Sequence, residues 1–274
     1  MTPTVTVITI SYNAENEIGA TIDSVLSQSV RDYEYVFIDG ASKDRTMELI
    51  RAGDARCEEL GIACQVVSEP DKGIYDAMNK GIALARGQWI LMLNAGDVLA
   101  HHRVFETVFS GKVYDADVLY GDVVYKDKSK NRYYYKRAVP APLKNIVTGM
   151  VFCHQCTFVR GEVLKAYGFD IGYRITADYD SFVRMYLDGK RFAYIQKVIS
   201  VYDCTGLSMA SLPEALAETN KIKAKAGFLV EDTTARGAIF RIKHLIRRLI
   251  QQHLPSVAYA KWRGWDTKLP ENME

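Results

Sequence analysis

Residues 89–97 read WILMLNAGD, an apolar run that ends in an amide, two small residues and a carboxylate. The apolar residues up to Leu93 are typical of a strand that is buried in an α/β sheet. Asn94 and Asp97 follow at the point where that strand ends. In open α/β sheets, ligands bind beyond the carboxyl ends of the strands. The stretch therefore predicts a core strand whose tip belongs to a ligand site.

Strand-like and helix-like patterns alternate through the first part of the chain. The strand-like segments are rich in β-branched and aromatic residues, and the helix-like segments repeat apolar residues at helical spacing. Strands that alternate with helices form right-handed crossovers and a mainly parallel sheet. The expected strands are residues 4–13, 33–40, 62–70 and 88–97, and the expected helices are residues 14–30, 42–61 and 73–87.

The second part of the chain has a more mixed pattern. Residues 116–127 and 131–139 read as two strands that are candidates for pairing, and residues 191–203 read as another strand. Residues 178–190 carry a broad apolar face at helical spacing and predict a helix. Residues 140–160 look like a loop. No internal repeat or low-complexity segment separates these elements.

The composition is that of an ordinary globular protein. Of the 274 residues, 48% are hydrophobic, 11% aromatic and 25% charged. No apolar run approaches the ~20 residues that span a bilayer, and the first residues lack the features of a signal peptide. Five scattered cysteines include one C-x-x-C, Cys153 and Cys156, without the second pair that a zinc site needs. These features predict a cytoplasmic protein with free thiols.

The C-terminal part of the chain is strongly basic. Residues 221–263 hold ten Lys or Arg and two acidic residues, a net charge of +8, which leaves −6 for the rest of a chain whose total is +2. Within residues 237–254, apolar residues recur at helical spacing and the basic residues fall largely on the other side. Such a helix suits an anionic membrane surface on the inner face of the membrane. A helix docked on the rest of the protein, or a dimer contact, is the open alternative.

Five segments carry a family pattern: residues 8–18, 36–46, 68–97, 154–170 and 175–187. In this order they resemble the family 2 glycosyltransferases, which are inverting enzymes of GT-A fold, over roughly residues 4–210. Each segment falls at an expected strand end or helix start, so the ordered set is more specific than any one piece. The resemblance implies a doubly wound, mainly parallel α/β sheet with a GT-A catalytic domain over residues 1–220, followed by a basic helical extension over residues 221–274. Residues 1–100 would bind the nucleotide-sugar and residues 101–220 would hold the acceptor and the base.

The resemblance places the nucleotide-sugar donor, most simply a UDP-sugar, along the strand ends of the first half. A flat base needs an aromatic or backbone wall and a few polar groups. Tyr12 and Ser11 stand where the family holds the base, and Asp39 stands where it commonly binds the uracil ring. Lys72 stands where a basic residue often lies near the phosphates. The full expected donor set is Ser11, Tyr12, Asn13, Asp39, Gly40, Asp71, Lys72, Gly73, Asn94 and Ala95.

A divalent cation, Mn²⁺ or Mg²⁺, is the cofactor that the resemblance implies, because it neutralises the departing diphosphate. The metal-binding D-x-D of the family is altered here. Gly96 replaces its first Asp, and the carboxylate that many members carry further upstream is Asn94, so Asp97 is the one acid left. His154 is a candidate for an additional ligand. Alternatively, His154 and Gln155 line the acceptor side.

The resemblance also assigns a general base, because an inverting transfer must take a proton from the acceptor hydroxyl. Asp178 matches the position of the base at the start of a helix, Ala177 stands where many members have Glu, and Asp180 reads as a polar residue of the helix turn. The chain lacks the Q-x-x-R-W motif and the membrane helices of processive synthases, which favours transfer of a single sugar. The expected acceptor is a glycan, lipid-linked as in bacterial surface-polysaccharide assembly, and no nucleic acid partner is expected.

Two other classes of protein remain open from the sequence. A sugar-phosphate nucleotidyltransferase also uses a doubly wound nucleotide-binding sheet, although the first expected strand here is not followed by a Gly-rich basic loop for a triphosphate. A catalytically degenerate nucleotide- or carbohydrate-binding protein would explain Asn94 and Gly96 in place of acids. The simultaneous presence of Asp39, Asp97 and Asp178 argues for an enzyme.

Overall fold

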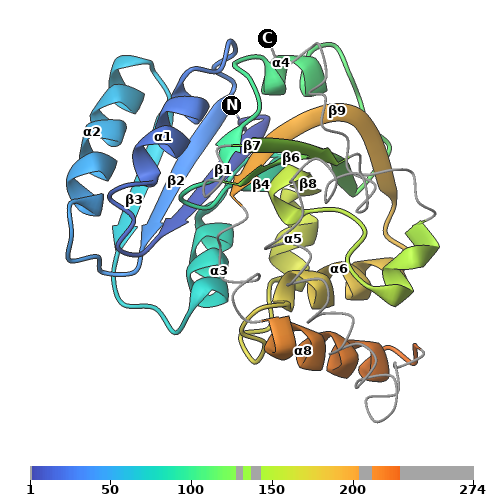
Figure 1. Ribbon diagram of the computed structural model, residues 1–274. Coiled ribbons are helices and arrows are strands. Elements are labelled where there is room, and N and C mark those ends of the chain that lie inside the picture. Colours follow the sequence, from blue (N-terminus) through green and yellow to red (C-terminus); the bar gives the residue numbers. More distant parts are fainter. Residues whose placement is uncertain (1, 128–131, 137–142, 204–211, 229–274) are drawn as a thin grey trace.

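The computed structural model describes residues 2–127, 132–136, 143–203 and 212–228. Within these ranges one nine-stranded sheet runs through the molecule in the order β3-β2-β1-β4-β8-β6-β9-β5, with β7 paired to β6 (Figure 1). The strands are β1 (Val5–Ser11), β2 (Tyr33–Asp39), β3 (Ala63–Ser68), β4 (Trp89–Met92), β5 (Val98–Leu99), β6 (Val118–Asp127), β7 (Arg132–Lys136), β8 (Thr157–Arg160) and β9 (Phe192–Asp203). The helices are α1 (Ile18–Leu26), α2 (Thr46–Glu59), α3 (Ile74–Leu84), α4 (Val104–Phe109), α5 (Gly161–Tyr167), α6 (Ala177–Leu187) and α8 (Leu212–Lys225), with short 3-10 turns η2 (Leu143–Thr148) and η3 (His154–Cys156).

The sheet is parallel through the strands of the first half, as the alternating pattern predicts, and mixed in the second half. Strand β1 pairs in parallel with β2 on one side and with β4 on the other, and β2 pairs in parallel with β3. The chain therefore moves outward from β1 to β3 and then returns to the other side of β1, which makes the boundary between β1 and β4 the switch point of the sheet. Strand β8 pairs antiparallel with both β4 and β6, and it joins the two expected halves of the chain in one sheet.

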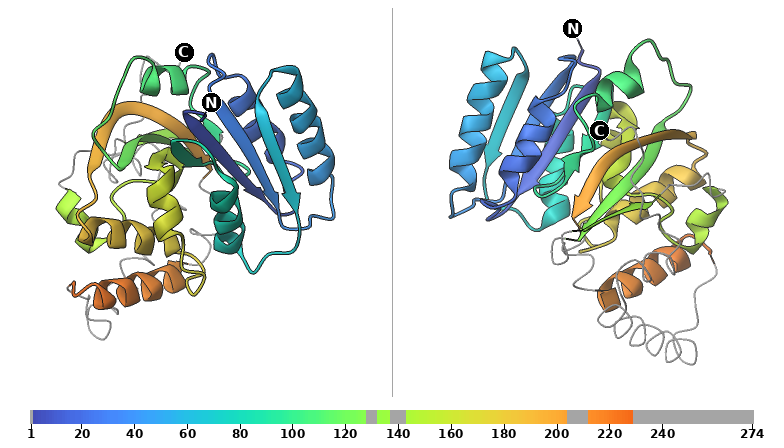
Figure 2. Two further views of the ribbon diagram at one scale, coloured as in Figure 1. Left: turned by 180° about the vertical axis from the view of Figure 1, so that it is seen from behind. Right: turned by 45° about the horizontal axis from the view of Figure 1, so that its top comes forward.

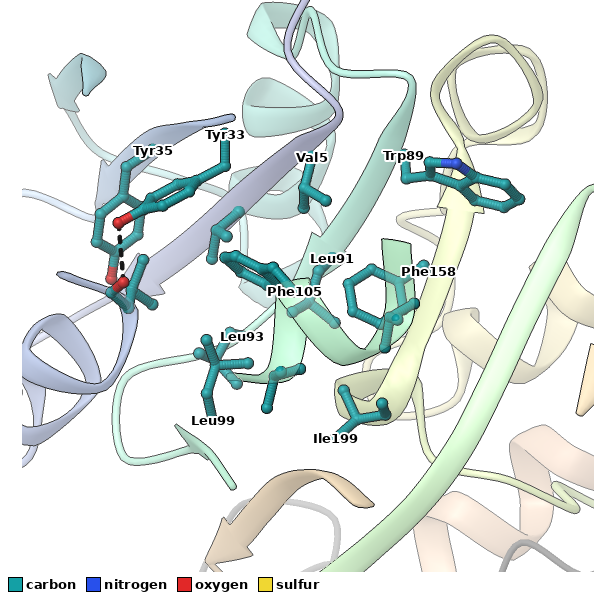
Figure 3. Close-up of a cluster of buried hydrophobic side chains, with 14 of the residues drawn as sticks. Val5, Tyr33, Tyr35, Trp89, Leu91, Leu93, Leu99, Phe105, Phe158 and Ile199 are labelled. Carbon is teal, nitrogen blue, oxygen red and sulfur yellow. Dashed lines mark hydrogen bonds between the residues drawn. The ribbon is translucent and has the colours of Figure 1, made fainter. Parts of the chain in front are cut away.

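Both faces of the sheet are covered by helices, because each core strand alternates its apolar side chains between two clusters. Helices α1, α2 and α4 bury their apolar residues in one cluster, which Figure 3 shows around Tyr35, Leu91 and Phe158. Helices α3, α5 and α6 bury theirs in the cluster on the other face. The odd-numbered residues of β4, such as Leu91, face the first cluster, and the even-numbered ones, such as Met92, face the second.

Some elements differ from the expectation. The stretch expected to be a loop, residues 140–160, contains η2, η3 and β8, so that expectation was wrong for its last residues. Strand β8 has only four residues and follows directly on η3, which leaves no turn signal between them. The two expected strands of residues 116–127 and 131–139 do pair, as the antiparallel β6 and β7, within the part that is described.

Helix α8 spans the boundary that the sequence analysis expects at residue 220 and packs against α6. Residue 220 lies inside α8, and Ile222 on the same helix is 1% exposed within the second cluster. Phe228 packs against that cluster as well, and both views of Figure 2 show α8 as an outer layer over α6. The basic helix expected within residues 237–254 lies outside the described residues. No helix within the described ranges is long and apolar enough to cross a membrane.

Candidate active site

The carboxyl ends of the first three strands are joined around the carboxylate of Asp39. The parallel register sets Ser11 beside Asp39 and Asp39 beside Ser68. Asp39 is fully buried and accepts hydrogen bonds from Ser11 Oγ at 3.1 Å, Ser68 Oγ at 2.8 Å and the backbone N–H of Ser42 at 2.9 Å. The Ser42 hydroxyl donates to it as well. Each serine hydroxyl keeps lone pairs that can accept from a ligand while it donates to Asp39.

The loop after β1 holds the one strongly exposed aromatic residue of the predicted donor set. Tyr12 is 64% exposed, so its ring is available as a wall for a flat ligand. Its neighbour Asn13 is used internally: its N–H donates to Ser42 Oγ at 2.8 Å and its Oδ1 accepts from the Lys43 N–H at 2.9 Å. Asn13 and Ala41 both have left-handed backbone, with φ of 48° and 59°. These bonds hold the loop that follows β1 against the loop that follows β2.

Gly40, Tyr12 and Asp71 lie close together at the carboxyl end of β2. A Cβ on Gly40 would lie 2.5 Å from Asp71 Oδ2 and 3.2 Å from Tyr12 Cδ2, so glycine is needed for this close approach. Asp71 accepts a hydrogen bond from the N–H of Gly73 at 2.8 Å, and Gly73 begins α3 with φ of 123°. Lys72, between them, is exposed. The structure thus brings the predicted donor residues that follow β1, end β2 and precede α3 to one edge of the sheet.

The tip of β4 is a tight turn that runs from Asn94 to Asp97. The N–H of Asp97 donates to the Asn94 carbonyl at 3.0 Å, and Gly96 between them has φ of 101°. Ala95 still donates to Ile10 of β1 at 3.1 Å, so the turn is anchored at the switch point. Asp97 is 5% exposed. The Oδ1 atom of Asn94 is buried and has no hydrogen-bond partner within the described residues.

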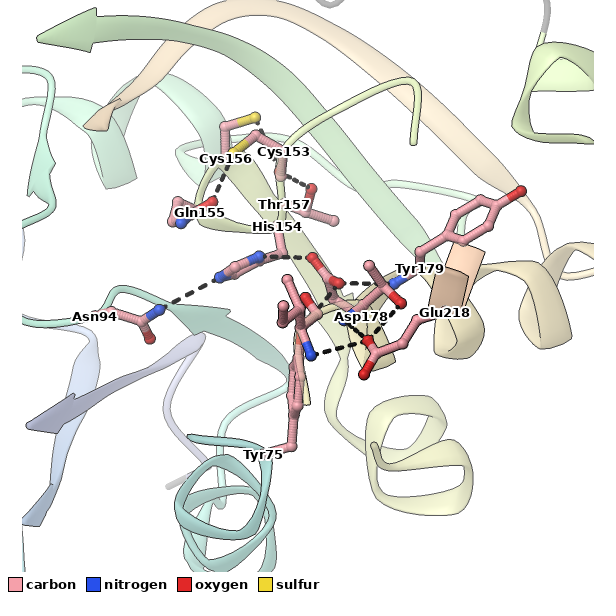
Figure 4. A network of polar contacts seen from close by, with 12 residues as sticks. Tyr75, Asn94, Cys153, His154, Gln155, Cys156, Thr157, Asp178, Tyr179 and Glu218 are labelled. Atoms are coloured by element: carbon pink, nitrogen blue, oxygen red, sulfur yellow. Dashed lines mark hydrogen bonds and ion pairs between the residues drawn. The ribbon is translucent and has the colours of Figure 1, made fainter. Parts of the chain in front are cut away.

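A chain of polar contacts links this strand tip to the predicted base (Figure 4). The amide nitrogen of Asn94 lies 3.5 Å from His154 Nε2, and His154 Nδ1 lies 2.9 Å from Asp178 Oδ2. The other oxygen of Asp178 accepts from Tyr75 OH at 3.1 Å and from the Tyr179 N–H at 2.9 Å. Three segments that are distant in sequence therefore meet at one carboxylate, and Asn94 is linked to it through His154.

His154 connects the tip of β4 with the predicted base, and the residues next to it make other contacts. If Asp178 accepts from Nδ1–H, a neutral imidazole turns the lone pair of Nε2 toward Asn94. Gln155, expected beside it, is 4% exposed and accepts from the Cys153 thiol. Burial raises the pKa of the Cys153 thiol, with smaller contributions from Cys156 and Asp97. The Cys153 thiol therefore stays protonated, and the Cys156 thiol donates to the carbonyl of Gly121 at 3.1 Å.

Two further observations refine the sequence prediction. Asp180, the neighbouring acid on α6, is 2% exposed and accepts from Arg184 Nε at 2.7 Å, so it is a structural residue, as predicted. Tyr75 was missed by the sequence analysis, because an aromatic residue in the first turn of a helix is typical of core packing. Burial, and then the charge of Asp178, raises the pKa of Tyr75 well above its ordinary value, so its hydroxyl stays protonated and donates.

Metal ligands are sparse in this region. Across the part of the chain that the structure describes, no three His, Cys, Asp or Glu side chains form a group that could hold a metal ion. The candidates at the strand tip are the carboxylate of Asp97 and the unpartnered amide oxygen of Asn94. This small oxygen set suits a hard cation that takes its remaining ligands from phosphate and water.

The fold is that of GT-A glycosyltransferases, as comparison with solved structures shows. Residues 1–349 of S. aureus TarS superpose with a TM-score of 0.61 at 17% identity, over 85% of this chain and 67% of that one. A mannosyltransferase of Pyrobaculum calidifontis, PcManGT, solved with GDP-Man and Mn²⁺, gives a TM-score of 0.60 at 19% identity, over 82% and 64% of the two chains.

Sequence comparison gives the family. The model for "Glycosyl transferase family 2" matches residues 6–186, and the chain belongs to this family. A Mycobacterium tuberculosis protein named only as an uncharacterized glycosyltransferase is 32% identical over 220 residues, or 78% of this chain and 80% of that protein. A Mycobacterium bovis PGL/p-HBAD biosynthesis glycosyltransferase is 28% identical over 205 residues, or 73% and 77% of the two chains.

Proposed function

We propose that this glycosyltransferase is an inverting, non-processive enzyme that moves one sugar from a nucleotide-sugar to a glycan. The observation that carries the proposal is the contact chain from Asn94 through His154 to Asp178. It joins the strand tip, where the donor's diphosphate would lie, to a carboxylate on the opposite wall. An inverting transfer needs that arrangement, since the acceptor must attack the face of the sugar opposite the leaving group.

The donor is proposed to lie along the carboxyl ends of β1, β2 and β4. Tyr12 would cover one face of the base, and the cluster of Ser11 and Asp39 would offer polar atoms to its edge. Lys72 is exposed beside the N-terminus of α3 and would face the phosphates. TarS has been solved with UDP-GlcNAc, which supports a UDP-sugar as the first donor to test. The remaining proposed donor residues are Asn13, Gly40, Asp71, Gly73, Asn94 and Ala95.

A divalent cation is proposed to bind at Asp97. PcManGT was solved with GDP-Man and Mn²⁺, and GalNAc-T7, which shares the fold, was solved with UDP, GalNAc and Mn²⁺. In this chain Asp97 would hold the cation, with the buried Oδ1 of Asn94 as a second oxygen. When bound, the cation would neutralise charge on the leaving diphosphate. His154 is proposed as an additional ligand, because donation of its Nδ1–H to Asp178 leaves the lone pair of Nε2, on the side of Asn94, for a cation.

Asp178 is proposed to be the general base. As the acceptor oxygen bonds to the anomeric carbon, its proton passes to the Asp178 carboxylate, and the bond from that carbon to the diphosphate oxygen breaks on the other face. His154 and the N–H of Tyr179 hold the two carboxylate oxygens in place. Gln155 and His154 would border the acceptor pocket.

The acceptor is proposed to be a glycan carried on a lipid. One relative, 28% identical to this chain, is named as a PGL/p-HBAD biosynthesis glycosyltransferase. The expected basic helix within residues 237–254 would bring the enzyme to the inner face of an anionic membrane. A cytoplasmic enzyme that is peripheral at this surface would reach a lipid-linked acceptor without a membrane-spanning helix.

A donor screen tests the proposal. Nucleotide release would be measured from UDP-glucose, UDP-galactose, UDP-GlcNAc and GDP-mannose, with Mn²⁺, Mg²⁺ or EDTA, and with lipid-linked glycans extracted from bacterial membranes. We expect release of a nucleoside diphosphate that depends on both cation and acceptor. Release of pyrophosphate from a nucleoside triphosphate and a sugar phosphate would instead indicate a nucleotidyltransferase. Nucleotide binding without turnover on any donor would indicate a degenerate binding protein.

A further inference from the structure

Glu218, on α8, holds the backbone directly ahead of the helix that carries Asp178. Its Oε1 accepts from the N–H of Arg174 at 2.7 Å. Its Oε2 accepts from the N–H groups of Ile175 and Thr176 at 3.0 and 2.9 Å. The hydroxyl of Thr176 adds a fourth bond at 3.0 Å. One carboxylate therefore binds three consecutive amides, and Figure 4 shows it facing this segment below Asp178.

The Glu218 carboxylate binds the chain just before α6 and does not cap the helix itself. Thr176 is the N-cap residue of α6, yet its side chain makes no capping bond to the helix, because its hydroxyl donates to Glu218 instead. The first amides of a helix need acceptors, and a negative charge near them is favourable. Glu218 thus binds, from another helix, the three amides directly ahead of α6 and adds a negative charge near the N-terminus of that helix.

The peptide of Ile175 is held from both sides. Its N–H is bound by Glu218, and its carbonyl accepts from Tyr75 OH at 2.6 Å. Tyr75 also lies 3.1 Å from Asp178 Oδ1 and belongs to the first turn of α3, directly after the predicted donor residues. Any shift of residues 174–176 would therefore move Asp178 relative to both His154 and the donor edge.

The helix that carries Glu218 is firmly attached. Ile222 is 1% exposed in the core, and Lys225 Nζ lies 3.9 Å from Asp180 Oδ1 on α6. The pKa of Glu218 lies below its ordinary 4.5: burial acts to raise it, but the hydrogen bonds from Arg174, Ile175 and Thr176 outweigh burial. Glu218 is thus an ionised acceptor on a fixed element.

We propose that Glu218 is a positioning residue for glycosyl transfer, which sets the place of the Asp178 carboxylate through the backbone of residues 174–176. The inference rests on the proposed role of Asp178 as base. It gives α8 a function that the predicted donor residues do not indicate. The helix supports the backbone segment that precedes the proposed base.

The test is a double-mutant cycle on the full chain, read as nucleoside diphosphate release with the donor and acceptor that the screen identifies. Glu218→Gln keeps the size of the side chain but presents an N–H₂ group to one of the amides it held. We expect kcat to fall by about 10- to 100-fold, as misplacement of a catalytic group does, with the donor KM changed less than about threefold. In an Asp178→Asn background, the same change should cost less than about twofold, since it acts through Asp178.

Glu214→Gln is the matched control, because Glu214 lies one turn earlier on α8 and only forms an exposed pair with Arg174 at 3.6 Å. It should leave kcat unchanged. Amide hydrogen exchange gives a readout besides activity: residues 174–176 should exchange faster in Glu218→Gln and not in Glu214→Gln.

The outcomes separate the two claims. If Asp178→Asn turns over normally, the proposed base is wrong. If Asp178→Asn is slow but Glu218→Gln costs the same in both backgrounds, or leaves kcat unchanged, the positioning role is overturned. A loss that appears wholly in the donor KM would also overturn it, because it would assign Glu218 to donor binding.

Discussion

At the scale of single residues, the carboxylates of the site are held by several protein donors each. Asp39 accepts from Ser11, Ser42 and Ser68, and Asp178 accepts from Tyr75, His154 and Tyr179. Several hydrogen bonds from different elements fix the position of a carboxylate. The site is therefore assembled before a ligand arrives, and the exposed ring of Tyr12 is what remains to adapt to the ligand.

Asp97→Ala should remove the part of nucleotide affinity that depends on a cation. Asp97 is the one acid in the turn of residues 94–97, so no carboxylate there can replace it. We expect the gain in UDP affinity on adding Mn²⁺ to fall at least ~10-fold, the low end of what loss of a residue supporting a metal costs. Calorimetry with UDP, with and without Mn²⁺, measures it. Glu58→Ala, an exposed change on α2, is the control, and an unchanged Mn²⁺ effect in Asp97→Ala would locate the cation elsewhere.

Gly40→Ala should weaken donor binding without unfolding the protein. The new Cβ would stand 2.5 Å from Asp71 Oδ2 and 3.2 Å from the Tyr12 ring, so both side chains must move. We expect UDP to bind about tenfold more weakly, the equivalent of ~1.4 kcal/mol. Gly19→Ala on α1, where no atom lies within 4 Å of the new Cβ, is the matched control and should bind UDP normally. Equal UDP affinity in both variants would contradict a donor site at Gly40.

At the scale of elements, long alternating patterns were predictable and short or tertiary-dependent pieces were not. Strands β1, β2 and β4 and the helices between the strands of the first half follow from apolar patterning, because these three strands are buried along their whole length and the helices on one face. Strand β8 has four residues and takes its place only through pairing with β4 and β6. Its sequence carries no local sign of that pairing.

The same reason explains which parts of the site escaped prediction. Asp178 and His154 could be found because their types and positions resemble a family pattern, and the structure then brings them within 2.9 Å. Tyr75 and Glu218 contact the base segment across about 100 and 42–44 residues of sequence, with no local motif. Contacts of this kind depend on how α3, α6 and α8 pack, which periodicity does not specify.

Glu218 should make the stability of the α6–α8 contact depend on pH. Its folded pKa is lowered below the ordinary 4.5, so its contribution is fully present above 4.5 and is lost as pH falls through the lowered folded value. We expect Glu218→Gln to be less stable than wild type at pH 7, with the difference shrinking below about pH 4.5. Urea unfolding across this range measures it. A difference that stayed constant down to pH 3 would mean that ionisation of Glu218 contributes nothing.

At the scale of the whole molecule, we propose that the body, which ends at Phe228, and the basic tail, which contains residues 237–254, have different functions. All proposed catalytic residues lie before Phe228, and the basic segment within residues 237–254 follows it. The body carries a net negative charge outside residues 221–263, so an anionic membrane would attract the tail and not the body. Such a division would present the active site to a lipid-linked acceptor.

Truncation after Phe228 should therefore abolish vesicle binding and spare transfer to a water-soluble acceptor analogue. Co-sedimentation with phosphatidylserine vesicles across a salt series measures the binding, which should weaken as salt rises. In the full chain, replacing Arg247 and Arg248 with Gln should weaken it about 30-fold, at ~1 kcal/mol per charge. If the full-length protein ignores these vesicles at low salt, or the truncated chain fails to fold, the tail is a structural part of the body.

The most direct test of the central claim is the anomeric configuration of the transferred sugar, measured by NMR on the product of the first donor that the screen identifies. A single displacement with Asp178 as base predicts a product whose anomeric configuration is inverted relative to the donor, formed by the wild type and slowed by ~10²–10⁴-fold in Asp178→Asn. Retention of configuration, or inversion at an undiminished rate in Asp178→Asn, would contradict the account.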